Sequence, residues 1–519
     1  MSISKTKSTR MSRRAFLGYT SALSFAAVLG QVHPVQAAEP VKGGHFVLGL
    51  KGGESTNSLD PALSASQVPF NILRGWGESL LNVAPDGGLE YRLAESVEAT
   101  DDGQSWHFTI RSGVKFHNGE TMTAQDVLKT MERHSNEDSK SGALGIMRGI
   151  ESMSVEGSVF TVNLTTASSD LPYLLADYHL VIQPNGGMDD PTAGIGTGPY
   201  KITENEPGAR HGFEKFADYW DDSRGHYDTY EIIVINDDTA RAAALQSGQV
   251  NAINIVSPKT AKLFGRAPGI SIETTSGRGH YVFVMHVDTP PFDNKDLRLA
   301  LKYAVNREEM VEKVLNGYGA VGNDTPINDA YPLFDETIPQ RQFDLDKARE
   351  HYAASGHDGS PIVLRVSDAA FAGALDAAAL FQQSAQAAGI PLEIKREPAD
   401  GYWSEVWNKQ PFAASYWGGR AVQDQMYTTA YLSTADWNDT RFKNADFDDL
   451  LLQARAELDE NKRKDVYGQM GRLLNEEGGL INPMFNQFID GVSAKVAGWE
   501  ANPNAEMMDG FIASKTWFE

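Results

Sequence analysis

The sequence predicts an α/β protein, because patterns typical of strands and of helices follow one another along its whole length. Residues 106–110 alternate apolar and polar side chains, as in a half-buried strand. Residues 296–316 carry apolar side chains at helical spacing, with Gly317 as the expected end of the helix. Residues 362–396 contain a strand, an alanine-rich helix and a second strand, which is a β-α-β unit. A chain of 519 residues is long enough for roughly three domains or lobes of about 150 residues.

Further elements follow the same two periodicities. Residues 46–48, 160–164 and 231–236 are expected strands. Thr123 with Asp126 three residues later suits the start of a helix. In such a pair, each side chain can accept a hydrogen bond from the backbone N–H of the other residue. Two amphipathic helices are expected near the C-terminal end, between residues 446 and 476.

A glycine cluster at residues 194–199 has the composition of a phosphate-binding loop. Such a loop should open a helix. Here Pro199 is followed by the alternating residues 200–202, which open a strand instead. The sequence therefore predicts no nucleotide site at this cluster.

The composition argues against several classes of protein. There are 46 basic and 69 acidic residues, a net charge of -23, whereas partners such as nucleic acid or anionic membranes require a basic surface. Without cysteine the chain has no disulfide, no thiolate metal site, no Cys nucleophile and no lipid-anchored N-terminal Cys. The mean hydropathy is -0.37 and no long apolar run follows the N-terminal region, so an integral membrane protein is not expected.

Residues 1–37 are expected to be an export signal. A basic stretch precedes the apolar and small residues 15–29, and the small residues of 35–37 suit cleavage after Ala37. Residues 12–17 match the twin-arginine pattern S-R-R-x-F-L. The alternative is an ordinary secretion signal that carries two arginines. Export without a membrane span predicts a soluble monomer in the periplasm.

Motifs for catalysis are missing from the sequence. H-E-x-x-H, G-x-S-x-G and G-x-x-x-x-G-K-[ST] do not occur. The 12 histidines are scattered, and the carboxylates form no cluster that suits a metal ion. We therefore expect neither an enzyme nor a cofactor or metal site, with a periplasmic hydrolase as the alternative.

Several segments match one family in order along the chain. They are residues 59–61, 94–98, 101–103, 106–119, 123–127, 196–201, 297–301, 305–307 and 343–348. Together they resemble the signature of the family 5 extracellular solute-binding proteins, which are the dipeptide-, oligopeptide- and nickel-binding subunits of ABC importers. The resemblance runs from about residue 44 to the end of the chain.

This resemblance implies the periplasmic binding protein fold, in which two α/β lobes joined by a two-strand hinge close on a ligand. The implied parts are lobe one at residues 38–284 plus 487–519, an extra subdomain of that lobe near 64–184, and lobe two at 285–486. Expected strands at residues 281–287 and 483–488 fit the two strands of the hinge.

The richest local signal for a ligand site lies at residues 402–417. Six of these sixteen residues are aromatic, against 10% in the whole chain, and aromatic walls with a few polar groups are typical of small-ligand clefts. We assign Trp403, Tyr416 and Trp417 to the cleft, with a buried strand core as the alternative. Phe412 and Trp407 are expected in the core.

Arg420 is where the sequence departs from its peptide-binding relatives. In those proteins a segment like W-x-G-D places an Asp here, which holds the α-ammonium of the peptide. An Arg instead binds carboxylate or phosphate through its planar fork, so the sequence predicts a ligand with an anionic group. The alternative is that Arg420 pairs with Asp424, which is itself a further candidate ligand residue.

The resemblance adds weaker candidates. Phe70 and Asn71 lie in a region that lines the pocket of relatives, and Arg148 of the extra subdomain is expected to close over the ligand. Arg278 or His280, beside the expected hinge strand, is a further candidate.

The expected function is that of a periplasmic solute-binding protein that delivers a small polar ligand to an inner-membrane ABC permease. The ligand classes are an opine-like conjugate, a sugar phosphate or a peptide. Alternatives are a peptide-binding protein proper, a nickel-chelate binder, and a sensor or chaperone of the same fold.

Overall fold

The computed structural model describes residues 39–100, 103–457 and 459–519. The expected signal at residues 1–37 and the motif residues Asp101 and Asp102 lie outside the described residues. Residues Pro40–Glu519 form one compact unit. Within its described part, no helix has the length and apolar character needed to cross a membrane.

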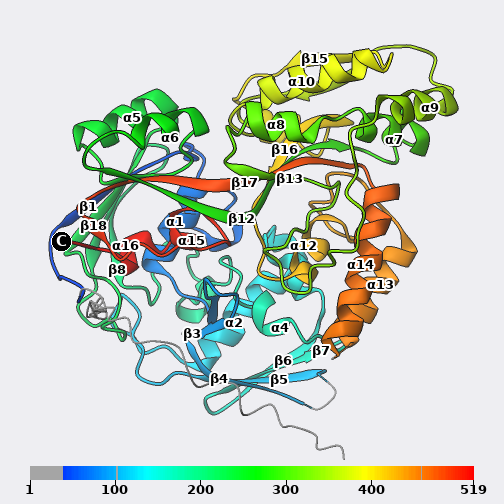
Figure 1. Cartoon of the computed structure of the whole chain (residues 1–519). Coiled ribbons are helices and arrows are strands. Elements are labelled where there is room, and N and C mark those ends of the chain that lie inside the picture. Colours follow the sequence, from blue (N-terminus) through cyan, green and yellow to red (C-terminus); the bar gives the residue numbers. More distant parts are fainter. Residues whose placement is uncertain (1–38, 101–102, 458) are drawn as a thin grey trace, which may run out of the picture. The chain divides into compact units, whose positions relative to one another are not determined.

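An 11-stranded sheet forms the centre of this unit (Figure 1). Ten strands follow one another in the order β15 (Leu392–Arg396), β14 (Ile362–Val366), β16 (Phe412–Trp417), β12 (Ile270–Met285), β17 (Leu480–Ser493), β11 (Ala252–Ile253), β1 (His45–Leu50), β10 (Thr229–Val234), β9 (Arg210–Lys215) and β8 (Tyr200–Glu206), while β13 (Gly319–Val321) pairs with β17. Parallel pairs such as β1 with β10 and β14 with β15 occur beside antiparallel ones, which confirms the expected α/β class.

Two long strands, β12 and β17, run through both halves of this sheet and lie side by side (Figure 1). Their pairing shifts register between Ser276 and His280. A Cβ atom on Gly277 or Gly279 would lie 2.4 or 2.8 Å from the ring of Phe488, so only glycine fits this close approach. The irregular stretch divides β12 into two separately paired segments.

The helices of the unit cover the sheets and the loops between them. They are α1 (Gln67–Trp76), α2 (Ala124–Ser135), α3 (Leu144–Met147), α4 (Leu171–Leu174), α5 (Asp238–Ser247), α6 (Pro258–Phe264), α7 (Lys295–Tyr303), α8 (Arg307–Lys313), α9 (Leu345–Ser355), α10 (Ala374–Ala387), α11 (Tyr402–Glu405), α12 (Gln423–Ala430), α13 (Ala445–Ala456), α14 (Glu460–Glu477), α15 (Glu506–Asp509) and α16 (Ile512–Lys515). The pair α13 and α14 is the expected one, and α10 with β14 and β15 forms the expected β-α-β unit.

A separate four-stranded antiparallel sheet lies within the region expected to be the extra subdomain. Its strands run in the order β4 (Ala94–Ala99), β5 (Ser105–Ile110), β7 (Val159–Leu164) and β6 (Ile150–Glu156). Buried residues of α2 share one core with this sheet. The helix begins as predicted, because the backbone N–H and the hydroxyl of Thr123 donate to an Asp126 oxygen at 2.8 and 2.7 Å. The two smaller sheets pair β2 (Leu81–Val83) with β3 (Leu89–Tyr91) and β18 (Val496–Ala497) with β19 (Trp517–Phe518).

The glycine cluster at residues 194–199 is a packing contact. A Cβ atom on Gly196 or Gly198 would lie 2.6 Å from backbone atoms of Trp76, at the end of α1. The small residues therefore let the loop approach this helix closely, and β8 begins at Tyr200 directly after it, as predicted.

The expectation of one helix over residues 296–316 is wrong, because the structure has two helices there. The side chain of Asn306 accepts the backbone N–H of Glu309 at 3.2 Å. This cap starts α8 after α7 has ended. Apolar spacing continues across the break, so periodicity alone does not reveal it.

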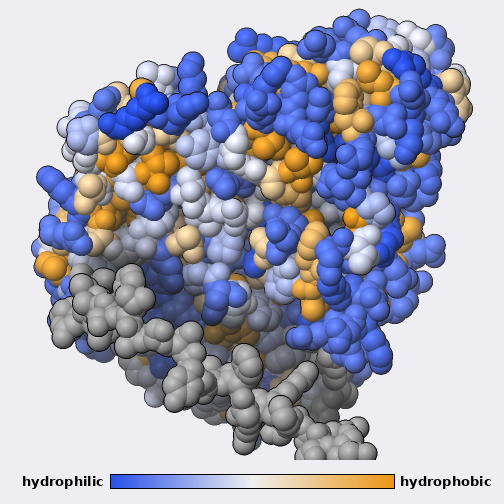
Figure 2. Space-filling view, viewed as in Figure 1, coloured by the Kyte–Doolittle hydropathy of each residue, from blue (hydrophilic) through white to orange (hydrophobic). Residues whose placement is uncertain are grey.

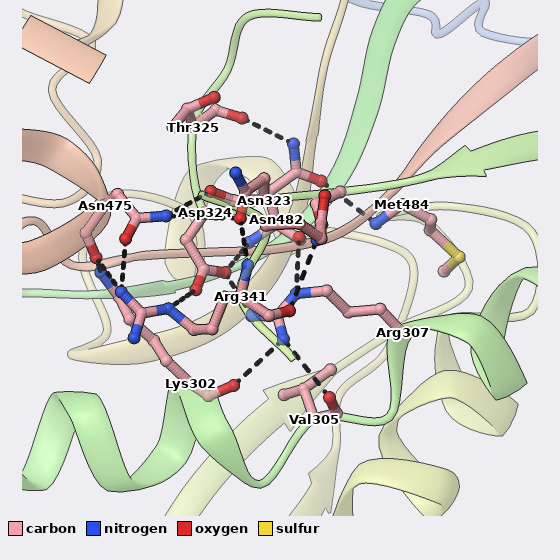
Figure 3. A network of polar contacts seen from close by, with 12 residues as sticks. Lys302, Val305, Arg307, Asn323, Asp324, Thr325, Arg341, Asn475, Asn482 and Met484 are labelled. Carbon is pink, nitrogen blue, oxygen red and sulfur yellow. Dashed lines mark hydrogen bonds and ion pairs between the residues drawn. The ribbon is translucent and has the colours of Figure 1, made fainter. Parts of the chain in front are cut away.

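A buried ionic cluster ties these helices to β17 (Figure 3). We call it the Asp324 cluster, and it consists of Arg307, Asp324, Arg341 and Asn482. Asp324 is fully buried and lies 2.6 Å from Arg307 Nη2 and 2.9 Å from Arg341 Nε. Its Oδ1 also accepts the backbone N–H of Asn482, on β17, at 3.0 Å. A buried carboxylate is stable here because two guanidinium groups compensate its charge.

Candidate functional site

A large cavity lies beside the irregular stretch of β12. Its volume is about 1050 Å³, which is at the upper end of the range of about 300–1,000 Å³ usual for small-molecule sites. Loops and strands from distant parts of the chain line it, including residues 51–56, 176–178, 368–372, 416–421 and 504–506. Figure 2 shows a largely hydrophilic outer face with small separate apolar patches, in keeping with the acidic composition.

One side of the cavity is a wall of four indole rings. This tryptophan wall consists of Trp403, Trp407, Trp417 and Trp437, which all line the cavity. The rings of Trp407 and Trp437 lie 5.8 Å apart and those of Trp407 and Trp417 lie 6.4 Å apart, both with edge-to-face geometry. Such contacts are favourable for aromatic pairs, so the wall is an ordered surface.

A buried carboxylate holds two members of this wall. Asp439 Oδ2 accepts the indole N–H of Trp407 at 2.9 Å and that of Trp417 at 3.2 Å. Asp439 is fully buried, and burial raises its pKa to about 7 although both indole groups favour the ionised form.

Five of the predicted site residues line the cavity, namely Phe70, Trp403, Tyr416, Trp417 and Arg420. Pairing of Tyr281 on β12 with Tyr416 on β16 brings the ends of these strands to the cavity. Contact of the five residues with a ligand stays a prediction. Phe412 is fully buried as expected. Trp407, also expected in the core, is partly buried against a hydrophobic core cluster and lines the cavity as well.

Arg420 lies in this cavity beside the tryptophan wall. Its guanidinium carbon lies 6.0 Å from the ring centre of Trp417, and Nη1 donates to the backbone oxygens of Gly419 at 3.0 Å and Gly418 at 3.5 Å. Among the residues that the structure describes, no carboxylate oxygen lies within 4.0 Å of this guanidinium. Arg420 therefore has donors available for an anionic group.

The expected alternative pair of Arg420 with Asp424 is not formed. Asp424 is fully buried and binds Arg455, with oxygens 2.5 Å from Nε and 2.9 Å from Nη2. Thr428 donates to the same carboxylate at 2.8 Å. Since α12 turns Asp424 toward α13, its carboxylate does not line the cavity, and the prediction of Asp424 as a ligand residue finds no support.

Two other predicted residues also lie outside the cavity. Asn71 is buried in α1, where its amide donates to the backbone oxygen of Gln67 at 2.8 Å. Arg148 is on the surface and binds Glu137 at 2.8 Å and Asp436 at 3.3 Å. Arg278, near the hinge strand, is likewise occupied, because it donates to Asn504 at 2.7 Å and to backbone oxygens.

Local sequence patterns did not indicate the acidic residues that line the cavity from the C-terminal segment. Glu506 and Asp509 belong to α15, where Met507, Met508, Asp509 and Gly510 all have positive φ angles between 55° and 76°. Asp509 pairs with Arg74 of α1 at 2.9 Å, and Gln67 donates to Glu506 at 3.0 Å. The two methionines are of a type that rarely adopts such a conformation, so the turn could not be expected from its residues.

Histidine and carboxylate side chains do not gather into a metal site. Within residues 39–519 as described, no group of three or more His, Asp or Glu side chains could hold a metal ion.

Comparisons with known proteins agree with this architecture. Residues 88–439 match the family described as bacterial extracellular solute-binding proteins, family 5 Middle. The glutathione-binding protein GsiB of Salmonella typhi is 23% identical over 473 residues, which are 87% of this chain and 91% of that protein.

Two solved structures share the fold with a TM-score of 0.83. One is AgaA of A. tumefaciens R10 in complex with agropinic acid, at 22% identity, covering 92% of this chain and 99% of AgaA. The other is DppA of Helicobacter pylori in complex with the peptide STSA, at 19% identity and the same coverage. These relatives are binding proteins. Since the family match spans more than half of the chain, the protein belongs to the family 5 bacterial extracellular solute-binding proteins.

Proposed function

We propose that this protein is the periplasmic receptor of an ABC importer, which captures a small polar solute in the cavity and delivers it to a permease in the inner membrane. The observation that carries the proposal is the cavity of about 1050 Å³ beside the register shift of β12 and β17. Parts of the chain on both sides of that shift line it, as closure about a hinge requires.

The division into lobes belongs to this proposal. Lobe one comprises residues 38–284 plus 487–519, with the extra subdomain near 64–184, and lobe two comprises 285–486. The register shift between Ser276 and His280 supports a hinge a few residues before the first of these boundaries. The receptor acts as a monomer and binds its solute without converting it, so an assay of the recovered solute should find it unchanged.

Arg420 and the tryptophan wall suggest the chemistry of the solute. A guanidinium without a carboxylate partner favours an anionic group, and indole rings favour a flat or apolar part beside it. An opine-like conjugate, a sugar phosphate and a peptide all meet this description. AgaA and DppA, whose structures contain agropinic acid and a peptide, support the first and the last of these.

The test begins with the solute that copurifies with the protein, identified by native mass spectrometry. That compound is then titrated calorimetrically into Arg420→Ala, Arg420→Lys and Arg420→Asp. Loss of a buried, charge-assisted contact costs about 2–5 kcal/mol, so Arg420→Ala should weaken binding at least about thirtyfold, since about 1.4 kcal/mol is tenfold. Lys should restore part of the affinity, and Asp should be worse than Ala.

Asp346→Ala is the matched control, because this carboxylate is 95% exposed on α9 and lies away from the cavity. An unchanged Kd in all three Arg420 variants would contradict the role of Arg420. If no small solute copurifies with the protein and none binds to it in titration, the receptor function itself would be contradicted.

A further inference from the structure

The charges that line the cavity are unequal in number. The lining carboxylates are those of Glu54, Asp177, Asp368, Asp400, Glu506 and Asp509. The lining cations are Lys51, Arg74 and Arg420. Arg74 is engaged by Asp509 at 2.9 Å and Lys51 by Asp238 at 3.4 Å. Arg420 therefore faces a cavity in which carboxylates outnumber cations two to one, which disfavours a ligand of high negative charge.

Glu506 is a lining carboxylate with no cation beside it. Its one side-chain partner is the neutral amide of Gln67, which donates to Oε2 at 3.0 Å. No lysine, arginine or histidine in the described part of the chain lies within 4.0 Å of it. A second carboxylate, Asp490, is buried nearby, and the charge of Glu506 contributes to raising its pKa. Burial raises the pKa of Glu506 to about 7.

The turn that carries Glu506 is fixed from three sides. Asp490 accepts the backbone N–H of Met507 at 2.8 Å, Met507 and Met508 are buried, and Asp509 is paired with Arg74. Left-handed backbone is unfavourable at non-glycine residues and persists only where the surroundings impose it. The position of Glu506 at the cavity is therefore set by the fold.

Glu506 and Arg420 both line the cavity, as Tyr416 does. Both act on the hydroxyl of Tyr416, where burial and Glu506 raise the pKa to about 12 and Arg420 opposes them. A single small solute that covers Tyr416 can thus approach the carboxylate of Glu506 on α15 and the guanidinium of Arg420 after β16.

We propose that Glu506 receives a cationic nitrogen of the solute while Arg420 receives its carboxylate, so that the solute is a zwitterion such as a peptide or an N-substituted amino acid. This inference rests on the proposed receptor function and narrows its ligand class. A sugar phosphate carries no cationic group for Glu506 and adds negative charge to a cavity already rich in it.

Defined probes test this assignment by calorimetric titration. The panel contains di- and tripeptides of alanine and glutamate with free termini, an N-(1-carboxyethyl) amino acid, the N-acetylated peptides, and glucose 6-phosphate. We expect binding among the free-amine probes. N-acetylation and Glu506→Gln should each weaken that binding at least tenfold, and the two changes together should cost little more than either alone.

Glu308→Gln is the matched control, since it removes one exposed carboxylate on α8, outside the cavity. The melting temperature of Glu506→Gln should be no lower than that of the wild type, because the amide carries no buried charge. This measurement separates loss of binding from loss of fold.

Three results would overturn the inference: equal binding of N-acetylated and free peptides, binding unaffected by Glu506→Gln, or a copurified solute without a basic nitrogen. In each of them a solute still binds, so the receptor function stands. Failure of the receptor function has a different signature, in which no probe of either kind binds and no solute copurifies.

Discussion

Asp439 is a buried carboxyl group that holds part of the tryptophan wall in place. It receives two indole N–H groups of the tryptophan wall while fully buried. Because burial raises its pKa from 3.8 to about 7, the folded protein holds a proton on Asp439 between about pH 4 and pH 7 that the unfolded chain has lost. Folding stability from this group therefore falls as the pH rises through that window.

Asp439→Asn should remove this contribution, since an amide does not titrate. Between pH 7 and pH 4 the variant should gain less stability on acidification than the wild type does. Calorimetric melting temperatures at several pH values give both slopes, with Asp346→Asn, an exposed carboxylate, as the control. Parallel curves for wild type and Asp439→Asn would show that Asp439 is ionised throughout.

At the level of single residues, the sequence indicated Arg420 as a cavity residue but did not indicate Glu506. Arg420 and the aromatic residues stand together within about twenty positions, so local composition reveals them. Glu506 reaches the cavity through a left-handed turn of ordinary residues held by Asp490 and Arg74. Such a turn depends on contacts between segments far apart in the sequence, and no local pattern encodes it.

Among the elements, β17 and the two helices α7 and α8 depend on the Asp324 cluster. Asp324→Ala would leave Arg307 and Arg341 buried without their carboxylate. Removal of one partner of a buried ion pair costs about 3–5 kcal/mol, and we expect a loss of that size in the free energy of unfolding, measured in urea. Asp324→Asn should cost less, because the amide oxygen still accepts hydrogen bonds.

Asp346→Ala, at an exposed ion pair, is the comparison and should change the free energy of unfolding by less than about 1 kcal/mol. A similarly small effect of Asp324→Ala would mean that water replaces the carboxylate, and that the cluster contributes little to stability.

Local elements were the more predictable part of the fold. Alternation identified β5 and β7, and the pair of Thr123 and Asp126 identified the start of α2. The break between α7 and α8 was missed, because apolar spacing continues through it while one Asn side chain decides where the second helix begins. Strand order was also beyond reach of periodicity, since β12 and β17 are joined by pairing across about 200 residues.

For the molecule as a whole, the lobes should close when the solute binds. Contacts across the proposed cleft already include Arg463 with Asp170 at 3.4 Å and Gln425 with Asp177 at 3.2 Å. Small-angle scattering should give a smaller radius of gyration with the copurified solute than after its removal. The solute should also raise the melting temperature. At a solute concentration of about 100 times Kd, it should stabilise the folded state by about 2.7 kcal/mol.

Arg463→Met keeps an apolar stem and removes the charged guanidinium, and should leave the solute-free protein more open and its affinity lower. Lys462→Met, exposed on the same helix, is the control. A radius of gyration that is the same with and without the solute would indicate a rigid binding module.

Export is the second property of the whole molecule. If residues 12–17 act as a twin-arginine signal, replacing Arg13 and Arg14 together by Lys should leave the precursor in the cytoplasm. Fractionation followed by immunoblotting measures this, with Lys5→Arg as the control. Normal periplasmic yield of the double variant would favour an ordinary secretion signal.

The tryptophan wall also gives the protein an optical property. Four of its nine tryptophans lie around one cavity, with neighbouring rings 5.8–6.4 Å apart. Indole emission responds to the polarity around the ring, and rings this close exchange excitation energy. A solute that displaces water from the wall should therefore change the intensity, colour and polarisation of the intrinsic fluorescence together, so that the unlabelled protein reports its own occupancy.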